Sequence, residues 1–338
     1  MKKILPLFIV IVSALSVTAQ DTFSITAIDS VTGETGSAGA SCVGSSTTYP
    51  HGAAILSDVI PGIGVIHTQA AWNPVNQQYA HDLMMAGLPP QQIIDSLVAN
   101  DATNNPTTRQ YGIADYNGGH PRSAAYTGVN CMDYKNHIIG QGYTIQGNIL
   151  MGQEILDSMQ ARFLSTSGTL SDRLMAALQG AKVIGADTRC AVKGTSSQSA
   201  FLRIGKPGDP FDSLYCDLWM AYPTNYPAPY PVDPIDSLQT LYDLWKLSVG
   251  TRPHGIPDQL KITVYLSGDQ IVVDLTHYTT IDGGMFTLMD ISGRVVLTGR
   301  LDRPVTRMTP VTRVASGIYL YRVTDASGSI RDSGKLCF

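Results

Sequence analysis

Hydroxyl side chains alternate along the first strand-like segment of this chain. Within Thr22–Ile28, Thr22 and Ser24 point to one face of the predicted strand, and Phe23 and Ile25 point to the other. A threonine at the start of a mature chain can act as a nucleophile, with its own α-amino group as the base. Thr22 is therefore a candidate catalytic nucleophile. The alternative is an ordinary strand that carries hydroxyls on one face.

An export signal precedes this strand. Two lysines, an apolar run over residues 5–17 and a small-x-small site ending at Ala19 predict a signal peptide over residues 1–19. Cleavage after Ala19 makes Gln20 the first residue, and cleavage after Gln20 makes Asp21 the first; in both cases the nitrogen of Thr22 stays in a peptide bond. An amide nitrogen is no base, so catalysis by Thr22 requires further trimming. We expect a secreted or cell-surface protein.

Two amides flank a glycine near the end of another predicted strand, Tyr143–Asn148. Gln146 and Asn148 could donate hydrogen bonds to an oxyanion or grip an amide substrate, and Gly147 would allow close approach. Buried amides also commonly satisfy backbone groups. We favour the site interpretation and assign Asn148 a catalytic role and Gln146 a substrate-binding role.

Two further pairs of polar residues are candidates for substrate binding, together with Ser24. Asp187 and Arg189 are two positions apart, so Arg189 could bind a substrate carboxylate or form a structural ion pair with Asp187. Thr68 and Gln69 end an apolar strand before a loop, where site residues tend to collect.

Composition excludes several classes of function. The net charge is −4, and residues 21–259 carry 12 basic against 20 acidic residues, which argues against nucleic acid as a partner. Glu34 and Glu154 are the only glutamates, so a Glu–Glu glycosidase pair is improbable, although an Asp pair stays open. Four histidines show no i, i+4 spacing, and we interpret them as ordinary: His67, His81, His120 and His137. We expect no metal and no cofactor.

The five cysteines show no C-x-x-C spacing, which removes support for zinc or thioredoxin-type chemistry. Export permits disulfides, and the odd number leaves at least one thiol unpaired within a monomer. The sequence does not say which ones pair among Cys42, Cys131, Cys190, Cys216 and Cys337.

Strands and helix pairs alternate over residues 20–249. Strands are expected near 22–28, 36–43, 64–70, 109–115, 122–127, 143–148 and 197–204, and helices near 79–84, 93–98, 155–163, 170–181 and 234–245. Helix pairs between strand groups favour antiparallel sheets covered by helices, in an α+β domain compatible with a four-layer α-β-β-α sandwich. Residues 207–234 read as a loop or strap.

A linker rich in Gly and Pro follows at residues 250–259. Residues 260–338 alternate in polarity and carry short turn signals, which predicts a small all-β, immunoglobulin-like sandwich.

Several blocks in residues 21–249 resemble one family when taken in order. They are Thr22-Phe23-Ser24-Ile25, then Thr68-Gln69, Thr108-Arg109-Gln110 and Thr127-Gly128, then Gly142 to Leu150, and finally Gly185 to Arg189 leading to Ser197-Gln198-Ser199-Ala200. This set resembles domain-of-unknown-function family 1028, which is assigned to the N-terminal-nucleophile hydrolase fold. The resemblance implies that fold and an amide-bond hydrolase acting on a small molecule or peptide.

The C-terminal segment resembles the type A sorting domain of the type IX secretion system. The similar blocks are Gly283 to Asp290, Ser292 to Val296, Ser316 to Val323 and Lys335-Leu336. The resemblance implies a Bacteroidetes-type cell, export across the outer membrane by the type IX machinery, and removal of residues 260–338 afterwards.

Two functions compete at this point. One is an exported amide-bond hydrolase with an N-terminal nucleophile, and the other is a non-catalytic binding protein on the same fold. The mature amino terminus distinguishes them. The substrate and the oligomeric state are not encoded in any pattern that we recognise.

Overall fold

The computed structural model describes residues 22–117, 119–250, 262–267, 270–275, 283–290, 294–309, 318–326, 328 and 330–337. The predicted signal peptide and most of the predicted linker lie outside these residues.

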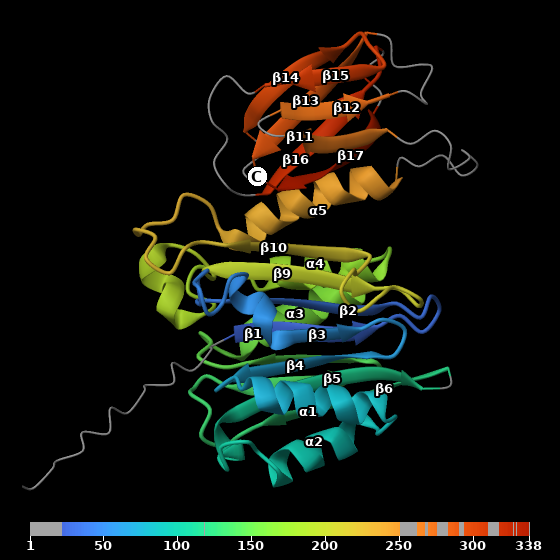
Figure 1. The fold of residues 1–338 in the computed structure, drawn as a ribbon. Coiled ribbons are helices and arrows are strands. Elements are labelled where there is room, and N and C mark those ends of the chain that lie inside the picture. Colours follow the sequence, from blue (N-terminus) through green and yellow to red (C-terminus); the bar gives the residue numbers. More distant parts are fainter. Residues whose placement is uncertain are drawn as a thin grey trace, which may run out of the picture.

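A six-stranded antiparallel sheet contains the first strand at its centre (Figure 1). Its order is β10-β9-β2-β1-β8-β7, so β1 has a paired neighbour on each side. The strands are β1 (Thr22–Ile28), β2 (Thr35–Ser41), β7 (Asn136–Gly140), β8 (Tyr143–Gly147), β9 (Ser199–Gly205) and β10 (Cys216–Ala221).

A second, four-stranded antiparallel sheet packs against the first. Its order follows the chain: β3 (Ser57–Ile60), β4 (Gly64–Ala70), β5 (Arg109–Asn117) and β6 (His120–Thr127). Short 3₁₀ turns lie at η1 (Gly52–Leu56), η2 (Pro106–Thr108) and η3 (Thr188–Lys193).

Helices cover the outer face of each sheet. The apolar faces of α3 (Gln153–Ser165), α4 (Leu170–Gly180) and α5 (Pro234–Gly250) pack on the six-stranded sheet in one large core that includes Phe23, Ile25 and Leu202. The second core joins α1 (Pro74–Met85) and α2 (Pro90–Ala99) to the four-stranded sheet through Ile66 and Ile113. Figure 1 shows α1 and α2 below the strands of that sheet.

Local sequence explains where these helices begin. The side chain of Asn73 accepts hydrogen bonds from the first turn of α1, and Pro74 opens the helix with a fixed φ. Thr169 and Asp172 form a capping box at the start of α4.

The interface between the two sheets is partly polar. Apolar contacts at one end come from Ile28, Val59, Val65 and Ala114. Elsewhere the inward-facing side chains of both sheets carry hydroxyl, amide and imidazole groups: Ser24, Thr26, Ser37, His67, Gln69, Gln110, Thr144 and Gln146, all fully or almost fully buried. Buried polar groups of this kind must bond to one another.

The C-terminal segment forms two further antiparallel sheets around a separate core that includes Phe286, Leu288 and Val323. One sheet has the order β11-β12-β15 and the other β14-β13-β16-β17. The strands are β11 (Thr263–Ser267), β12 (Gln270–Asp274), β13 (Gly284–Asp290), β14 (Val295–Leu301), β15 (Val305–Met308), β16 (Ile318–Thr324) and β17 (Ile330–Cys337).

The predicted α+β class, with antiparallel sheets, is confirmed. The prediction that residues 207–234 form only a loop or strap is wrong, because β10 (Cys216–Ala221) lies within them as the edge strand beside β9. Two short strands, β3 and β7, were also missed. None of the described helices is long and apolar enough to cross a membrane.

Candidate functional site

Antiparallel pairing brings Thr22 and Asn148 together at one end of the strands of the six-stranded sheet, where β1 begins and β8 ends; we call this end the site edge. Thr22 begins β1, and Phe23 pairs with Gly147, the last residue of β8. The next residue, Asn148, donates its backbone N–H to the carbonyl oxygen of Thr22 at 3.1 Å. Both residues are buried. The two candidate catalytic residues are therefore neighbours.

Gln69 reaches the same point from the opposite sheet. Its side-chain nitrogen donates to the carbonyl oxygen of Thr22 at 3.3 Å, and its side-chain oxygen accepts the hydroxyl of Ser24 at 2.6 Å. Ser24 and Thr22 lie on the same face of β1, as the alternation predicts. Four of the predicted site residues thus converge: Thr22, Ser24, Gln69 and Asn148.

Gln146 joins this group through Ser24. Its nitrogen donates to Ser24 Oγ at 2.7 Å, and its oxygen accepts the Thr144 hydroxyl at 2.8 Å. Gln110, which the sequence analysis did not select, accepts from Gln69 at 2.7 Å and donates to the carbonyl of Gly147 at 2.9 Å. The bond from Gln110 to Gly147 crosses between the sheets, as do the two bonds of Gln69 to Thr22 and Ser24.

His67 is a second residue that sequence reasoning missed. Its Nδ1 lies 2.8 Å from Ser24 Oγ, and its Nε2 lies 2.6 Å from Ser37 Oγ. Complete burial, and the positive charge of Arg203, lower the pKa of His67 to about 3. The imidazole is therefore neutral at ordinary pH and serves as a hydrogen-bonding group. Its place two residues before Gln69 on the same strand face was the available signal.

Thr68 lies on the other face of β4. Its neighbours His67 and Gln69 both bond to Ser24, so alternation turns Thr68 toward the helix-covered side, where Ile66 packs against α1 and α2. Its buried hydroxyl has no hydrogen-bond partner among the described residues. Thr68 is therefore not brought together with the other candidates.

Asp187 and Arg189 form an ion pair at the same edge. Arg189 Nη2 lies 2.8 Å from Asp187 Oδ2, and Arg189 Nε lies 3.1 Å from Oδ1. Asp187 Oδ2 also accepts the backbone N–H of Cys42 at 2.7 Å. Cys42 follows Ser41, which pairs directly with Thr22. The structural ion pair that we considered from the sequence is present, and the Arg189 side chain keeps 32% of its surface exposed.

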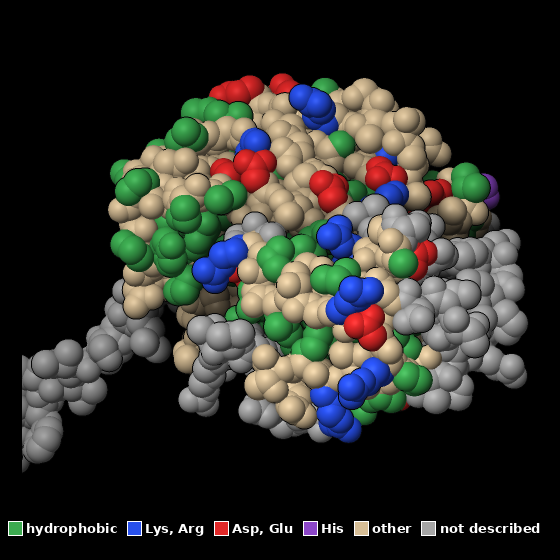
Figure 2. Space-filling model, turned by 90° about the horizontal axis from the view of Figure 1, so that it is seen from above, with side chains coloured by type: hydrophobic (Ala, Val, Ile, Leu, Met, Phe, Trp, Pro, Cys, Tyr) green, Lys and Arg blue, Asp and Glu red, His purple; other side chains and the backbone are tan. Residues whose placement is uncertain are grey.

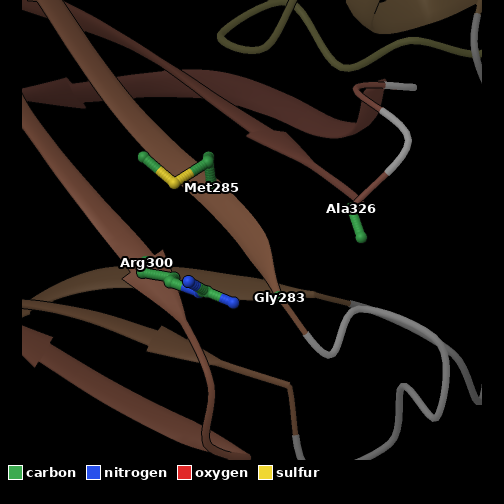
Figure 3. A pocket seen from close by; sticks show the side chains of 4 residues that line it. All are labelled: Gly283, Met285, Arg300 and Ala326. Carbon is green, nitrogen blue, oxygen red and sulfur yellow. The ribbon is translucent and has the colours of Figure 1, made fainter.

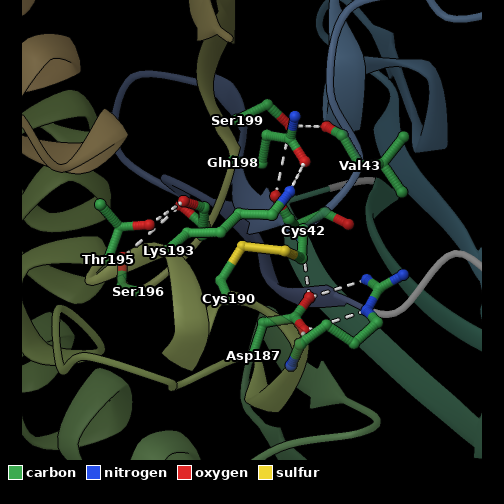
Figure 4. The surroundings of a disulfide bond; sticks show 12 residues. Cys42, Val43, Asp187, Cys190, Lys193, Thr195, Ser196, Gln198 and Ser199 are labelled. Carbon is green, nitrogen blue, oxygen red and sulfur yellow. Dashed lines mark hydrogen bonds and ion pairs between the residues drawn. A yellow bond between two sulfur atoms is a disulfide. The ribbon is translucent and has the colours of Figure 1, made fainter. Parts of the chain in front are cut away.

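A disulfide holds this arrangement in place. Cys42 bonds to Cys190 (Figure 4), which joins the end of β2 to the turn η3 across 148 residues of sequence. Figure 4 also shows the amine of Lys193 directed at the side chain of Gln198, beside the disulfide. Lys193 is half-buried, and that burial together with the charge of Arg189 lowers the pKa of its amine.

Two residues with positive φ mark the same edge. Ala70, directly after Gln69, has φ of 66°, and Ile149, directly after Asn148, has φ of 53°. Left-handed backbone is rare for a residue with a side chain and is a true outlier for β-branched isoleucine. Strain of this kind concentrates at functional sites. It singles out this edge as the candidate active site.

The comparisons agree with the fold. A family model described as "Family of unknown function (DUF1028)" matches residues 22–227. The chain belongs to DUF1028. A solved structure of the same family, protein SPO2555 from Silicibacter pomeroyi, is similar with a TM-score of 0.53 and 23% sequence identity, covering 67% of this chain and 86% of that one. At that identity the likeness shows the fold alone. No curated protein matches.

Apolar side chains are exposed around the site of this DUF1028 protein. The carbonyl of Met132 accepts the N–H of Ile149, and the N–H of Met151 donates to the carbonyl of Ala186, so these segments lie side by side next to Asn148. Exposed apolar side chains on or beside them are Val129, Met132, Met151, Ile184 and Val192. On the face of the molecule that is seen from above, hydrophobic side chains also gather at the left (Figure 2). Such surface suits a ligand with an apolar group.

A pocket in the C-terminal segment of the DUF1028 protein lies apart from this edge (Figure 3). Among the described residues it is lined by Gly283, Met285, Arg300 and Ala326, and Arg300 is paired with Asp302 at 2.9 Å. These side chains include no nucleophile, acid or base. Within the described part of the chain, no cluster of three His, Cys, Asp or Glu residues could hold a metal ion.

Proposed function

We propose that residues 22–250 form an amide-bond hydrolase whose N-terminal nucleophile is Thr22. The observation that carries this proposal is the position of Thr22. It opens the central strand β1 with its carbonyl held by Asn148 and Gln69, at an edge where two backbone positions are strained. The family resemblance to N-terminal-nucleophile hydrolases, and the packing of two helix-covered antiparallel sheets, support the same four-layer fold.

The reaction follows from a free α-amino group on Thr22. The amine takes the hydroxyl proton of Thr22, and Oγ1 attacks the substrate carbonyl carbon to give a tetrahedral oxyanion. Asn148 is the oxyanion donor. The C–N bond then breaks, the amine product leaves with the proton, and the acyl group stays on Thr22 as an ester. Water, activated by the same amine, hydrolyses the ester and restores the hydroxyl.

The remaining residues have supporting roles. Gln69, on the opposite sheet, holds the carbonyl of Thr22, and Gln69 and Gln146 both bond to Ser24 on the inner face of β1. Arg189, fixed by Asp187, offers its exposed side to a substrate carboxylate or carbonyl. The exposed apolar side chains beside Asn148, which include Met132 and Met151, bind the acyl part of the substrate. The substrate class is thus a small-molecule or peptide amide with an apolar acyl group. Thr68 has no part, because it lies on the other face of β4.

Three chains test this proposal. One begins at Thr22, one begins at Gln20, and one begins at residue 22 with the substitution Thr22→Ala. A panel of acyl amides is offered to each, and released amine is measured. We expect turnover only in the chain that begins at Thr22, with Asn148→Ala lowering kcat in that chain by about 100-fold. Equal turnover by all three chains would send the search to another nucleophile.

The predicted signal cleavage favours a second function. If the mature protein keeps Gln20, the nitrogen of Thr22 remains an amide and the site can only bind. The protein is then a non-catalytic extracellular binding protein on the same fold. Mapping the mature amino terminus by mass spectrometry separates the two functions, since only a chain that starts at Thr22 is compatible with the hydrolase.

Residues 260–338 are proposed as the sorting domain for type IX secretion, on the resemblance of their motifs alone. We expect mature protein at the cell surface of the native host to lack this segment, because exposed Gly/Pro-rich linkers are preferred sites of proteolysis. Deleting the segment should leave the remainder in the periplasm. Surface protein that invariably ends at Phe338 would refute the assignment.

A further inference from the structure

A continuous set of hydrogen bonds joins His67 to the backbone of Thr22 through Ser24 and Gln69. His67 contacts Ser24 at 2.8 Å, Ser24 contacts Gln69 at 2.6 Å, and Gln69 contacts the carbonyl oxygen of Thr22 at 3.3 Å. None of the four residues is more than 1% exposed. With no bulk water available, each proton in the set must go to a neighbour in the protein.

The direction of these bonds is fixed by backbone carbonyls. A carbonyl oxygen only accepts, so the group of Gln69 that faces Thr22 is its NH₂. The same nitrogen donates to Gln110 Oε1, and the orientation of Gln110 is fixed because its own nitrogen donates to the carbonyl of Gly147. The oxygen of Gln69 therefore faces Ser24 and accepts its hydroxyl proton.

This direction determines the tautomer of His67. Ser24 has one proton and gives it to Gln69, so the proton between Ser24 Oγ and His67 Nδ1 belongs to the imidazole. Gln146 Nε2 also donates to Ser24 Oγ, so this oxygen accepts from both Gln146 Nε2 and His67 Nδ1. The shared acceptor accounts for the 3.1 Å contact between the two nitrogens. His67 is thus the neutral Nδ1–H form, and its Nε2 accepts from Ser37.

The other groups around His67 favour the neutral ring. Ser37 is backed by the hydroxyl of Ser57 at 2.7 Å, and the ring of Phe201 meets the imidazole edge-on at a centroid distance of 5.9 Å. The charged group that acts on it is Arg203, whose Nε is paired with Asp217 at 3.0 Å. The groups in contact with the ring, Ser24, Ser37 and Phe201, carry no carboxylate that would stabilise an imidazolium.

We propose that His67 is a positioning residue for the reaction of Thr22: its Nδ1–H orients Ser24, Ser24 orients Gln69, and Gln69 holds the carbonyl group of Thr22. This inference rests on the proposed function. Holding that carbonyl fixes the rotation about the Cα–C bond of Thr22, and with it the angle between β1 and the α-amine and hydroxyl. Small errors in such angles slow a reaction strongly.

Nitrogen NMR of the chain beginning at Thr22, with ¹⁵N-labelled imidazoles, tests the hydrogen-bond direction without any substrate. The His67 signals are identified by their absence in His67→Gln. We expect the ¹⁵N chemical shifts of His67 to be those of a neutral imidazole with its proton on Nδ1, and to stay unchanged from pH 8 to pH 5. In Gln69→Leu the Ser24 proton loses its acceptor and turns to Nδ1, so the tautomer should change to Nε2–H. The control Gln179→Leu, whose amide bonds to Gln239 on the outside of the domain, should keep Nδ1–H.

An Nε2–H signal in the unsubstituted protein, or an unchanged tautomer in Gln69→Leu, would overturn the inference. A second arm measures the rate at which a β-lactone acylates Thr22. His67→Asn keeps a donor near the position of Nδ1 and should react within threefold of the unsubstituted chain, whereas His67→Leu should react at least tenfold more slowly with unchanged circular dichroism. Equal rates for the Leu variant would refute positioning. If Thr22 is not acylated in any chain, the proposed function fails and positioning fails with it, while the tautomer result still stands on its own.

Discussion

Replacing His67 with glutamine should make the protein less sensitive to acid. His67 stays neutral in the folded protein, because burial and Arg203 lower its pKa to about 3. In the unfolded chain the same side chain takes up a proton below about pH 6.5. Unfolding is therefore coupled to proton uptake, and the free energy of unfolding falls as the pH drops from about 6.5 toward 3. Glutamine does not titrate, so this part of the loss should disappear.

The size of the effect follows from the two pKa values. Each pH unit well inside the window changes the free energy of unfolding by about 1.4 kcal/mol, and about half as much near pH 6.5, where the unfolded side chain is half protonated. The difference between the two proteins should therefore change by about 2 kcal/mol between pH 6.5 and pH 4.5. At pH 7 the variant is expected to be less stable by about 1–3 kcal/mol, because glutamine can replace only one of the two imidazole hydrogen bonds. The prediction concerns the slope with pH and not this offset.

Urea unfolding at a series of pH values measures the slope. The three tryptophans Trp72, Trp219 and Trp245 all lie in residues 22–250, so their fluorescence reports on this domain alone. Carboxylates and the other histidines titrate in both proteins and cancel in the difference. Parallel curves from pH 7 to pH 4.5 would show that the folded protein accommodates a charged His67, and would refute the assignment of a neutral buried imidazole.

Two other predictions concern the disulfide and a buried ion pair. Reducing the Cys42–Cys190 disulfide, or replacing both cysteines with alanine, should lower the free energy of unfolding by about 2–5 kcal/mol, because the bond closes a long loop in the unfolded chain; an unchanged urea midpoint in dithiothreitol would contradict this. Arg109→Ala should lower the free energy of unfolding by about 3–5 kcal/mol, because it leaves the carboxylate of Asp101 buried without its partner. Lys182→Ala, at the exposed pair with Asp236, should lower it by less than about 1 kcal/mol. Similar losses for both variants in urea unfolding would show that burial does not govern the strength of these pairs.

Alternation along single strands was enough to predict part of the site. It placed Thr22 and Ser24 on one face of β1, and the Ser24 hydroxyl on that face contacts Gln69 from the opposite sheet. The same rule separates Thr68 from Gln69. Treating those two residues as one pair overlooked that adjacent strand residues face opposite ways. It also places His67 beside Gln69, which the search for metal spacing did not consider.

Contacts between distant segments were beyond the sequence. Asn148 lies beside Thr22 only because β8 pairs with β1 in one particular register, and a shift of one residue would turn its side chain to the other face. The pairing of Cys42 with Cys190 likewise depends on how η3 folds back onto the end of β2. Strand β10 was missed because its neighbours are rich in Pro and Tyr, which predicted a strap over the whole segment.

In the proposed mechanism Thr22 becomes a nucleophile when its α-amine is free. Tandem mass spectrometry of acyl adducts tests it most directly, after a β-lactone is incubated with chains that begin at Thr22 and at Gln20. We expect an acyl group on the hydroxyl of Thr22 in the first chain and none in the second. An adduct on another residue, or equal labelling of Thr22 in both chains, would contradict it.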